Sequence, residues 1–152
     1  MCDTKVGKAR KYAEKEFEKE GKDLDDVLPD FDKNYRLLRK KCSESLDIDR
    51  EDMPVVSADD IRGQLKKIQI KDLLPTQGEI WLEKVIKGII KKGTDPFSSN
   101  TIVVSEEGYV LDGHHRYAQA MLAGPDLEIK AVCVPLDIKK LLQVGKAIED
   151  KD

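Results

Sequence analysis

The spacing of apolar residues divides the first third of the chain into two helices. In residues 1–21 the apolar positions recur every three or four residues between charged ones, as Val6, Ala9, Ala13 and Phe17. After an acidic connector at 21–29 the same spacing returns with Phe31, Tyr35, Leu38, Cys42 and Leu46. Both patterns are typical of amphipathic helices. We therefore expect an N-terminal helical hairpin that covers part of the core or, alternatively, contacts a partner.

The middle of the chain alternates between helical and extended patterns. Ser57 at a cap position, with Asp60 three residues later, predicts a short helix over 57–66. The alternation of residues 67–70 predicts the first core strand. After Pro75 a strong apolar stripe closed by Gly93 predicts a longer helix, with Leu82, Val85, Ile86, Ile89 and Ile90 facing the core.

The last third of the chain combines a hairpin, two helices and a further strand. Residues 101–105 and 109–111 are extended stretches joined by a Ser-Glu-Glu-Gly turn, and a loop at 94–100 precedes them. A helix over 114–123 ends at Gly124-Pro125, a strand follows at 129–134, and Asp137 can cap a final helix. The elements predict an α+β fold, in which a small mixed sheet of about four strands is surrounded by helices.

A soft boundary falls near Pro54, which restricts Met53 to extended geometry. We place a helical N-terminal extension at 1–56 and the main domain at 57–152.

Composition limits the core and the compartment. Hydrophobic residues make up 39% of the chain and charged residues 38%, so we expect a small core under a heavily solvated surface. The three cysteines are odd in number and widely spaced, which favours unpaired thiols in a reducing compartment over a disulfide frame or a zinc site. The sequence has no apolar run near the ~20 residues that span a bilayer. We expect a soluble, cytoplasmic protein without a membrane partner.

The net charge of −3 weighs against one class of partner. A protein that binds duplex DNA mainly through its phosphates usually has a basic face, whereas this chain has 30 acidic residues against 27 basic ones. Nucleic acid stays possible through the basic residues of 36–41 and 84–92.

The stretch Tyr-Val-Leu-Asp-Gly-His-His-Arg-Tyr at 109–117 carries the candidate chemistry. It predicts a strand, a turn and a helix start, and both histidines of the chain lie in it. The first amides of a helix lack internal partners and form an anion site, most often for phosphate. Gly113 allows close approach of a ligand, and His115 and Arg116 can donate hydrogen bonds to phosphate oxygens.

Asp112 has three open interpretations. Its carboxylate could hold a phosphate-bound Mg²⁺ ion, accept a proton from an attacking hydroxyl, or simply cap the helix. Arg116 could equally serve only in an ion pair with Glu106, Glu107 or Asp126. A metal site on His114 and His115 is disfavoured, because adjacent helical residues point about 100° apart. The motif contains no serine or cysteine for a nucleophilic triad.

A second set of candidate residues lies on the helix expected after Pro75. Gln77 and Lys84 are seven residues apart, so they would point the same way two turns along one helical face. One side of this helix could then serve a ligand while the other side packs in the core.

Residues 68–142 resemble the superfamily of the ParB N-terminal domain and sulfiredoxin, in particular small phage- and microbe-type members with an Asp-Gly-His-His-Arg box. The resemblance covers, in order, a strand, Leu-Leu-Pro-Thr-Gln, a helix, a hairpin, the box, a helix and a last strand. Residues 1–56 lie outside it. Members of this superfamily are often labelled ParB-like nucleases.

The resemblance implies nucleotide contacts and excludes two activities. In sulfiredoxins a Cys-His-Arg sequence supplies the nucleophile and two ATP contacts. Here His114 takes the place of that cysteine, so peroxiredoxin repair is not expected, whereas His115 and Arg116 match the phosphate-binding pair. Gln77 and Lys84 become secondary nucleotide contacts. The Gly-Glu-Arg-Arg box of ParB proteins is not reproduced and no helix-turn-helix follows, so chromosome partitioning is not expected.

The fold also includes free-serine kinases, in which an acidic residue beside the nucleotide activates a hydroxyl. Asp112, Glu79 or Glu83 would take that place here. We expect a domain that binds ATP or a similar nucleotide with Mg²⁺ on Asp112, and that hydrolyses it or transfers its phosphate to a small-molecule or protein acceptor. The catalytic candidates are Asp112, His114 and Glu79.

Two alternatives from other classes stay open. One is a nucleic-acid-binding module or nuclease of ParB-like type. The other is a non-catalytic adaptor or homodimer that uses the N-terminal helices.

Overall fold

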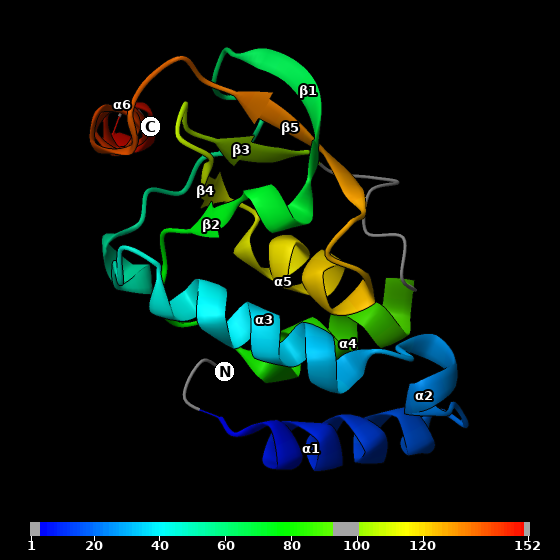
Figure 1. Cartoon of the computed structure of the whole chain (residues 1–152). Helices are drawn as coiled ribbons and strands as arrows, with labels where there is room; N and C mark the ends of the chain where they lie inside the picture. The colour runs from blue at the N-terminus through cyan, green and yellow to red at the C-terminus, as the bar shows by residue number, and fades with distance from the viewer. Residues whose placement is uncertain (1–3, 93–100, 151–152) are drawn as a thin grey trace.

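A computed structural model describes residues 4–92 and 101–150 and has an α+β fold (Figure 1). Its strands are β1 (Gln64–Gln69), β2 (Leu74–Pro75), β3 (Ile102–Val104), β4 (Tyr109–Asp112) and β5 (Glu128–Cys133). Its helices are α1 (Val6–Lys19), α2 (Leu24–Val27), α3 (Phe31–Ser43), α4 (Leu82–Lys92), α5 (His114–Ala123) and α6 (Ile138–Asp150). Two 3-10 turns, η1 (Arg50–Asp52) and η2 (Ile70–Asp72), lie in the connections.

The five strands form one mixed sheet in the order β1-β5-β3-β4-β2. The pairs β1/β5 and β3/β4 are antiparallel, whereas β3/β5 and β2/β4 are parallel. The sheet therefore has one strand more than the sequence predicts, because the two-residue β2 adds to β4 at the edge. The predicted hairpin of β3 and β4 is confirmed, with the amide of Gly108 donating to the carbonyl of Ser105 in its turn.

Alternate residues of the strands pack into two separate hydrophobic clusters. Ile102 and Val104 of β3 belong to a large cluster with α1, α3, α4 and α5, whereas Val103 between them joins a smaller cluster with α6. Side chains of a strand point alternately to opposite faces, so one hydrophobic strand supports both. Figure 1 shows the resulting layers, with α6 on one side of the sheet and α5, then α3 and α4, then α1 on the other.

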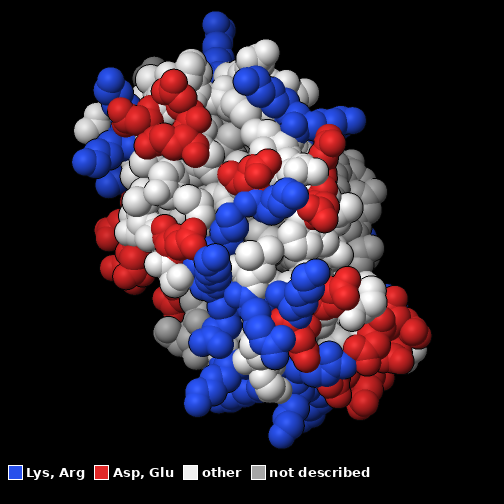
Figure 2. All heavy atoms as spheres, in the orientation of Figure 1, with Lys and Arg blue, Asp and Glu red and all other residues white. Residues whose placement is uncertain are grey.

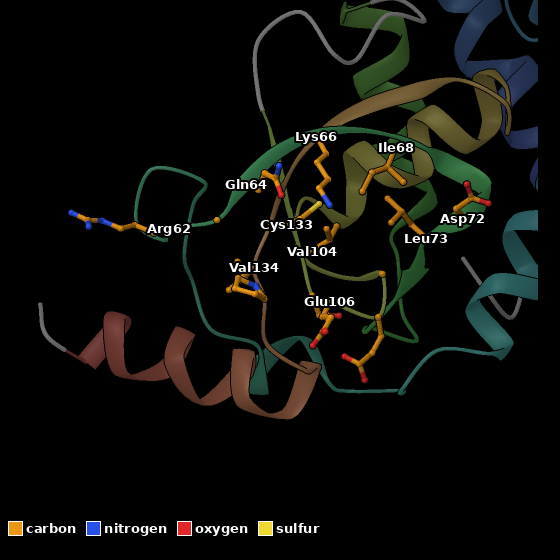
Figure 3. A pocket seen from close by; sticks show the side chains of 15 residues that line it. Arg62, Gln64, Lys66, Ile68, Asp72, Leu73, Val104, Glu106, Cys133 and Val134 are labelled. Carbon is orange, nitrogen blue, oxygen red and sulfur yellow. The ribbon is translucent and has the colours of Figure 1, made fainter.

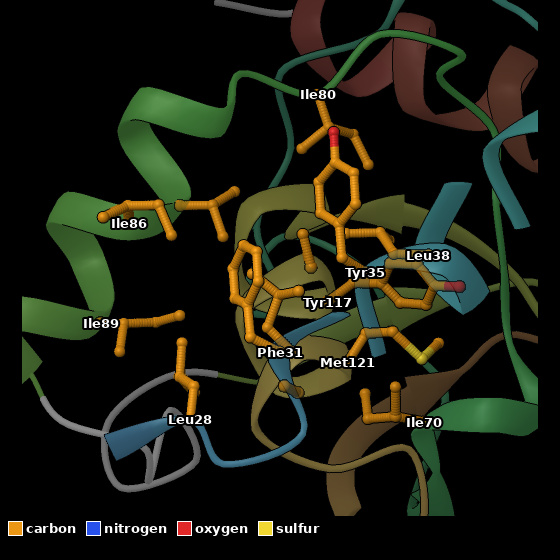
Figure 4. Packing of buried hydrophobic residues seen from close by; sticks show 14 of the residues in the cluster. Leu28, Phe31, Tyr35, Leu38, Ile70, Ile80, Ile86, Ile89, Tyr117 and Met121 are labelled. Carbon is orange, nitrogen blue, oxygen red and sulfur yellow. The ribbon is translucent and has the colours of Figure 1, made fainter. Parts of the chain in front are cut away.

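The N-terminal helices are part of the larger core. Phe17 of α1 and Phe31, Tyr35 and Leu38 of α3 have no exposed surface. The rings of Phe31 and Tyr35 stack with centroids 5.7 Å apart, and Figure 4 shows them packed with α4 and α5. The apolar stripe of the hairpin thus covers the core of the chain itself.

The helix expected over 57–66 is absent. Ser57 and Asp60 do make the expected local contacts, since the amide of Ser57 donates to the Asp60 carboxylate at 3.0 Å. The chain nevertheless turns at 57–61 and enters β1 at Gln64, whose six residues pair with β5. A single capping contact stabilises much less than a complete strand pairing, so the prediction of a helix here is wrong.

The helix after Pro75 begins too late to include Gln77. Gln77 and Lys84 could share a helical face only if both residues lay in this helix. Gln77 lies in an extended segment and forms an isolated parallel bridge with Ile48, and α4 starts only at Leu82. The prediction that both residues point from one helical face is therefore wrong. Gly93 and the loop at 94–100 lie outside the described residues.

The cysteines also differ from expectation. Cys42 is disulfide-bonded, whereas Cys133 is a free thiol and Cys2 lies outside the described residues. The prediction of unpaired thiols is therefore wrong for Cys42. No helix in residues 4–92 and 101–150 has the length and apolar character needed to cross a membrane.

Candidate functional site

Gly113 forms the corner between β4 and α5. Its φ of 95° and ψ of 33° lie in the left-handed region, which residues with a side chain rarely adopt. A Cβ at this position would lie 2.5 Å from Cγ2 of Ile102. Both the backbone conformation and the space thus require glycine, and the chain turns sharply from the strand into the helix.

The start of α5 presents backbone donors. The first intrahelical bond runs from the amide of Tyr117 to the carbonyl of Gly113, at 2.9 Å. The amides of His114, His115 and Arg116 precede it, so they have no carbonyl within the helix to donate to. Together they form the positive end of the helix dipole.

A hollow of about 310 Å³ opens directly at this helix start. One wall is the corner itself, residues 112–116, and Gln77 lies beside it. Another wall comes from far away in the sequence and consists of Met53, Pro54 and Val55. The structure therefore brings together five of the predicted site residues, Asp112, Gly113, His114, His115 and Arg116, with a sixth, Gln77.

His114 points into the protein and is only 4% exposed. Its Nε2 accepts hydrogen bonds from the backbone amides of Thr76, at 3.1 Å, and Gln77, at 3.3 Å. An atom that accepts from an amide carries no proton, so the neutral ring is protonated on Nδ1. Burial, together with the smaller effect of the charge of His115, lowers the pKa of His114 to about 3.

This geometry gives His114 a positioning role. Its ring joins the first turn of α5 to the segment after β2, and the Thr76 hydroxyl, 3.0 Å from Nε2, donates to the carbonyl of Val110 at 2.8 Å. These contacts hold Gln77 close to the helix start. Catalysis by His114 stays a prediction.

Asp112 and Arg116 form the charged part of the hollow. Burial raises the pKa of the Asp112 carboxyl, and the charge of Asp60 adds to this, while Arg116 and the Gly113 amide act in the opposite direction. Arg116 Nη1 lies 3.5 Å from the carbonyl oxygen of Thr101, which holds the guanidinium near the corner. The carboxyl of Asp112 therefore retains a proton more readily than an exposed aspartate does.

Two predicted residues lie elsewhere. Lys84 is exposed on α4, with Nζ 4.6 Å from the centroid of the Trp81 ring, and it does not line the hollow. Glu79 is exposed on the segment before α4 and is likewise not among the residues of the hollow. Neither residue lines the hollow at the start of α5.

Sequence reasoning missed the wall at 53–55 and the support from Thr76. The amide of Ile48 donates to the carbonyl of Thr76 at 3.0 Å, and this contact brings the segment after α3 alongside the corner. Long-range pairing of this kind has no local pattern. The proline at position 54 was the available signal, although it indicated a boundary rather than a wall.

The side chains of the hollow could hold a metal ion only if a bound ligand supplied further contacts to it. Within residues 4–92 and 101–150, no cluster of three or more His, Cys, Asp or Glu side chains could hold a metal ion. Mg²⁺ commonly binds through one or two carboxylates, with water and substrate phosphates completing its shell. Asp112 can supply one such carboxylate, so the site fits an ion that arrives with phosphates.

Comparison with known proteins finds no matching family model, no matching curated protein and no matching solved structure.

Proposed function

We propose that the hollow at the start of α5 binds the phosphates of a nucleotide. The carrying observation is the convergence on one hollow of Arg116 and three amides of the first helical turn. Anions are stabilised at helix starts by the backbone amides of the first turn and by the helix dipole, and an arginine adds a forked, permanently charged donor. The resemblance of the Asp-Gly-His-His-Arg box to sulfiredoxin-type nucleotide sites supports the same ligand.

Different residues of the hollow would contact different parts of the nucleotide. The amides of 114–116 hold oxygens of the phosphate nearest the helix, and Gly113 allows the sharp turn that places these amides at the hollow. Arg116 neutralises phosphate charge, and His115 adds a ring donor. The apolar wall at 53–55 offers a surface for the less polar part of the ligand.

Asp112 is the residue that would turn binding into catalysis. A hydroxyl or a water that attacks the terminal phosphorus forms a new O–P bond and releases the nucleoside diphosphate as the bridging bond breaks. The Asp112 carboxylate accepts the proton that this attacking oxygen loses. Arg116 stabilises the charge that develops on the phosphoryl oxygens. Bound Mg²⁺ would supply further charge neutralisation beside Asp112.

Calorimetry tests the proposal. We expect ATP or another common nucleoside triphosphate to bind more tightly with Mg²⁺ than without it. Arg116→Ala should weaken this binding at least tenfold, because a charge-assisted contact contributes about 1.5–3 kcal/mol. Lys130→Ala removes an exposed lysine of β5 and is the matched control, which should bind as the wild type does. Absence of binding by ATP, GTP, CTP and UTP would refute the proposal.

The second candidate function is nucleic-acid binding, supported by a basic region along α3. Lys33, Arg36 and Lys40 are exposed on this helix, and Figure 2 shows Lys and Arg side chains gathered over it, with acidic side chains close by. Phosphate-driven binding weakens steeply with salt. A gel shift that falls away between low and physiological salt, and that is lost in Arg36→Ala, would favour this candidate.

A further inference from the structure

A second and larger hollow lies at the opposite end of the sheet from the start of α5. It has a volume of about 800 Å³, and its lining residues differ throughout from those at the start of α5. Ile68 of β1, Val104 of β3 and Leu73 after η2 form apolar walls, and the thiol of Cys133 lies beside them (Figure 3). Pockets of ~300–1,000 Å³ with mostly apolar walls and few polar groups are typical of small-molecule sites.

Lys66 is an exposed lysine of β1 that lines this hollow. It pairs with Ala131 of β5, and Ala131 in turn pairs with Ile102 of β3. Paired residues of neighbouring strands point to the same face, so Lys66 is on the face that elsewhere carries the fully buried Ala131 and Ile102. Figure 3 shows its side chain extending toward Cys133 and Val104, whereas Arg62 points away.

The ammonium group of Lys66 makes no ion pair with any residue in the described ranges 4–92 and 101–150. Of the acids around the hollow, Glu107 accepts the amide of Ile138 at 2.7 Å, so its carboxylate is used as a cap for α6. Asp72 and Glu106 are exposed at the rim. Burial raises the pKa of the Cys133 thiol, so this wall stays uncharged at neutral pH.

We propose that this hollow binds an amphipathic monocarboxylate, with its apolar body against Ile68, Leu73 and Val104 and its carboxylate on Lys66. The apolar walls select the body, and the unpaired ammonium selects a negative end. The rim carboxylates of Asp72 and Glu106 repel a ligand with several negative charges, which separates this site from a phosphate site. The proposal is independent of nucleotide binding at the start of α5.

Three ten-carbon probes test the chemistry by calorimetry on the full chain, each below its micellar concentration. Decanoate carries the proposed anion, decanol carries none, and decylamine carries the opposite charge. Decanoate should bind most tightly, decanol more weakly, and decylamine least. Lys66→Met keeps an apolar stem and should weaken decanoate about tenfold, to the affinity of decanol.

The neighbouring lysine provides the matched control. Lys67 pairs with Lys130 and points to the opposite face of the sheet, so Lys67→Met should leave the affinity for decanoate unchanged. Thermal melts of both variants confirm that they are folded. The proposal is overturned if wild type binds none of the probes, or if Lys66→Met binds decanoate as tightly as wild type does.

Discussion

The Nε2 atom of His114 lies 3.1 Å from the backbone nitrogen of Thr76 and accepts its hydrogen. The two residues are 38 positions apart, and this bond joins the first turn of α5 to the segment after β2. The acceptor must remain unprotonated, because a protonated Nε2 would face the amide hydrogens of Thr76 and Gln77. The position of the corner at the start of α5 thus depends on a neutral imidazole.

Folding should therefore weaken in acid through His114. Its pKa is about 3 in the folded protein against an ordinary value of 6.5, so between these values the unfolded chain binds the additional proton. The stabilising contribution is complete above pH 6.5 and is lost as the pH falls toward 3, with a slope of up to about 1.4 kcal/mol per pH unit. Denaturant unfolding from pH 7.5 to 4.5 measures this slope.

His114→Gln isolates that effect. The side-chain oxygen of glutamine can accept from the same amides but does not titrate. The variant should lose less stability than wild type between pH 7.5 and 4.5, even if it starts lower. An equal loss in both proteins would assign the acid sensitivity to other groups.

Gly113→Ala should destabilise the protein by about 1–3 kcal/mol, because alanine is strained at positive φ and its Cβ meets Ile102. Gly7→Ala is the contrasting control. A Cβ at Gly7 of α1 meets nothing within 4 Å, so this change should stabilise by about 0.5 kcal/mol through helix propensity. Chemical denaturation of both variants measures the difference. An unchanged midpoint for Gly113→Ala would contradict the geometry of the corner.

The N-terminal helices should be indispensable for folding. Phe31→Ala removes a fully buried ring from the cluster that α3 shares with α4 and α5, and it should cost about 3–5 kcal/mol. Val144→Ala on α6, where the side chain is 36% exposed, should change stability by less than about 0.5 kcal/mol. A fragment of residues 57–152 should lack a cooperative melt by circular dichroism. A folded fragment would show instead that these helices are a separable extension.

The Asp112→Asn variant tests whether the protein catalyses phosphate transfer or hydrolysis, or only binds the nucleotide. If Asp112 accepts the proton of the attacking oxygen, turnover should fall by about 100-fold or more, because an amide is not a base. Nucleotide affinity should change much less, since the amides and Arg116 remain. Phosphate release and calorimetry on the same preparation measure the two properties. Unchanged turnover would remove Asp112 from the reaction.

Local patterns predicted the corner well because its signals are local. The apolar residues of 109–111, the glycine at 113 and the stop at Gly124 define a strand, a turn and a helix without any distant contact. The prediction of a helix at 57–66 failed for the converse reason, since the conformation of β1 is decided by β5, whose residues 128–133 lie far along the chain. The wall at 53–55 and the Thr76 bond to His114 also arise only when distant segments meet.

The predicted shared face of Gln77 and Lys84 shows how residue spacing alone can predict the wrong geometry. Their seven-residue spacing places them together only on a continuous helix, and the bridge of Gln77 to Ile48 keeps this segment extended until Leu82. Gln77 reaches the hollow from a strand-like segment, while Lys84 lies over Trp81.

Titration of the ¹⁵N-labelled protein with Mg-ATP, and with the other nucleoside triphosphates, tests the proposed phosphate site most directly. Binding at the start of α5 should shift the amide resonances of His114, His115 and Arg116 in a saturable manner, because these amides are the proposed phosphate donors, and that of Gly113 should shift with them because it is the adjoining residue of the corner. The same titration of Arg116→Ala should require at least tenfold more nucleotide. Amide resonances of these four residues that remain unmoved at millimolar nucleotide would contradict the proposed function.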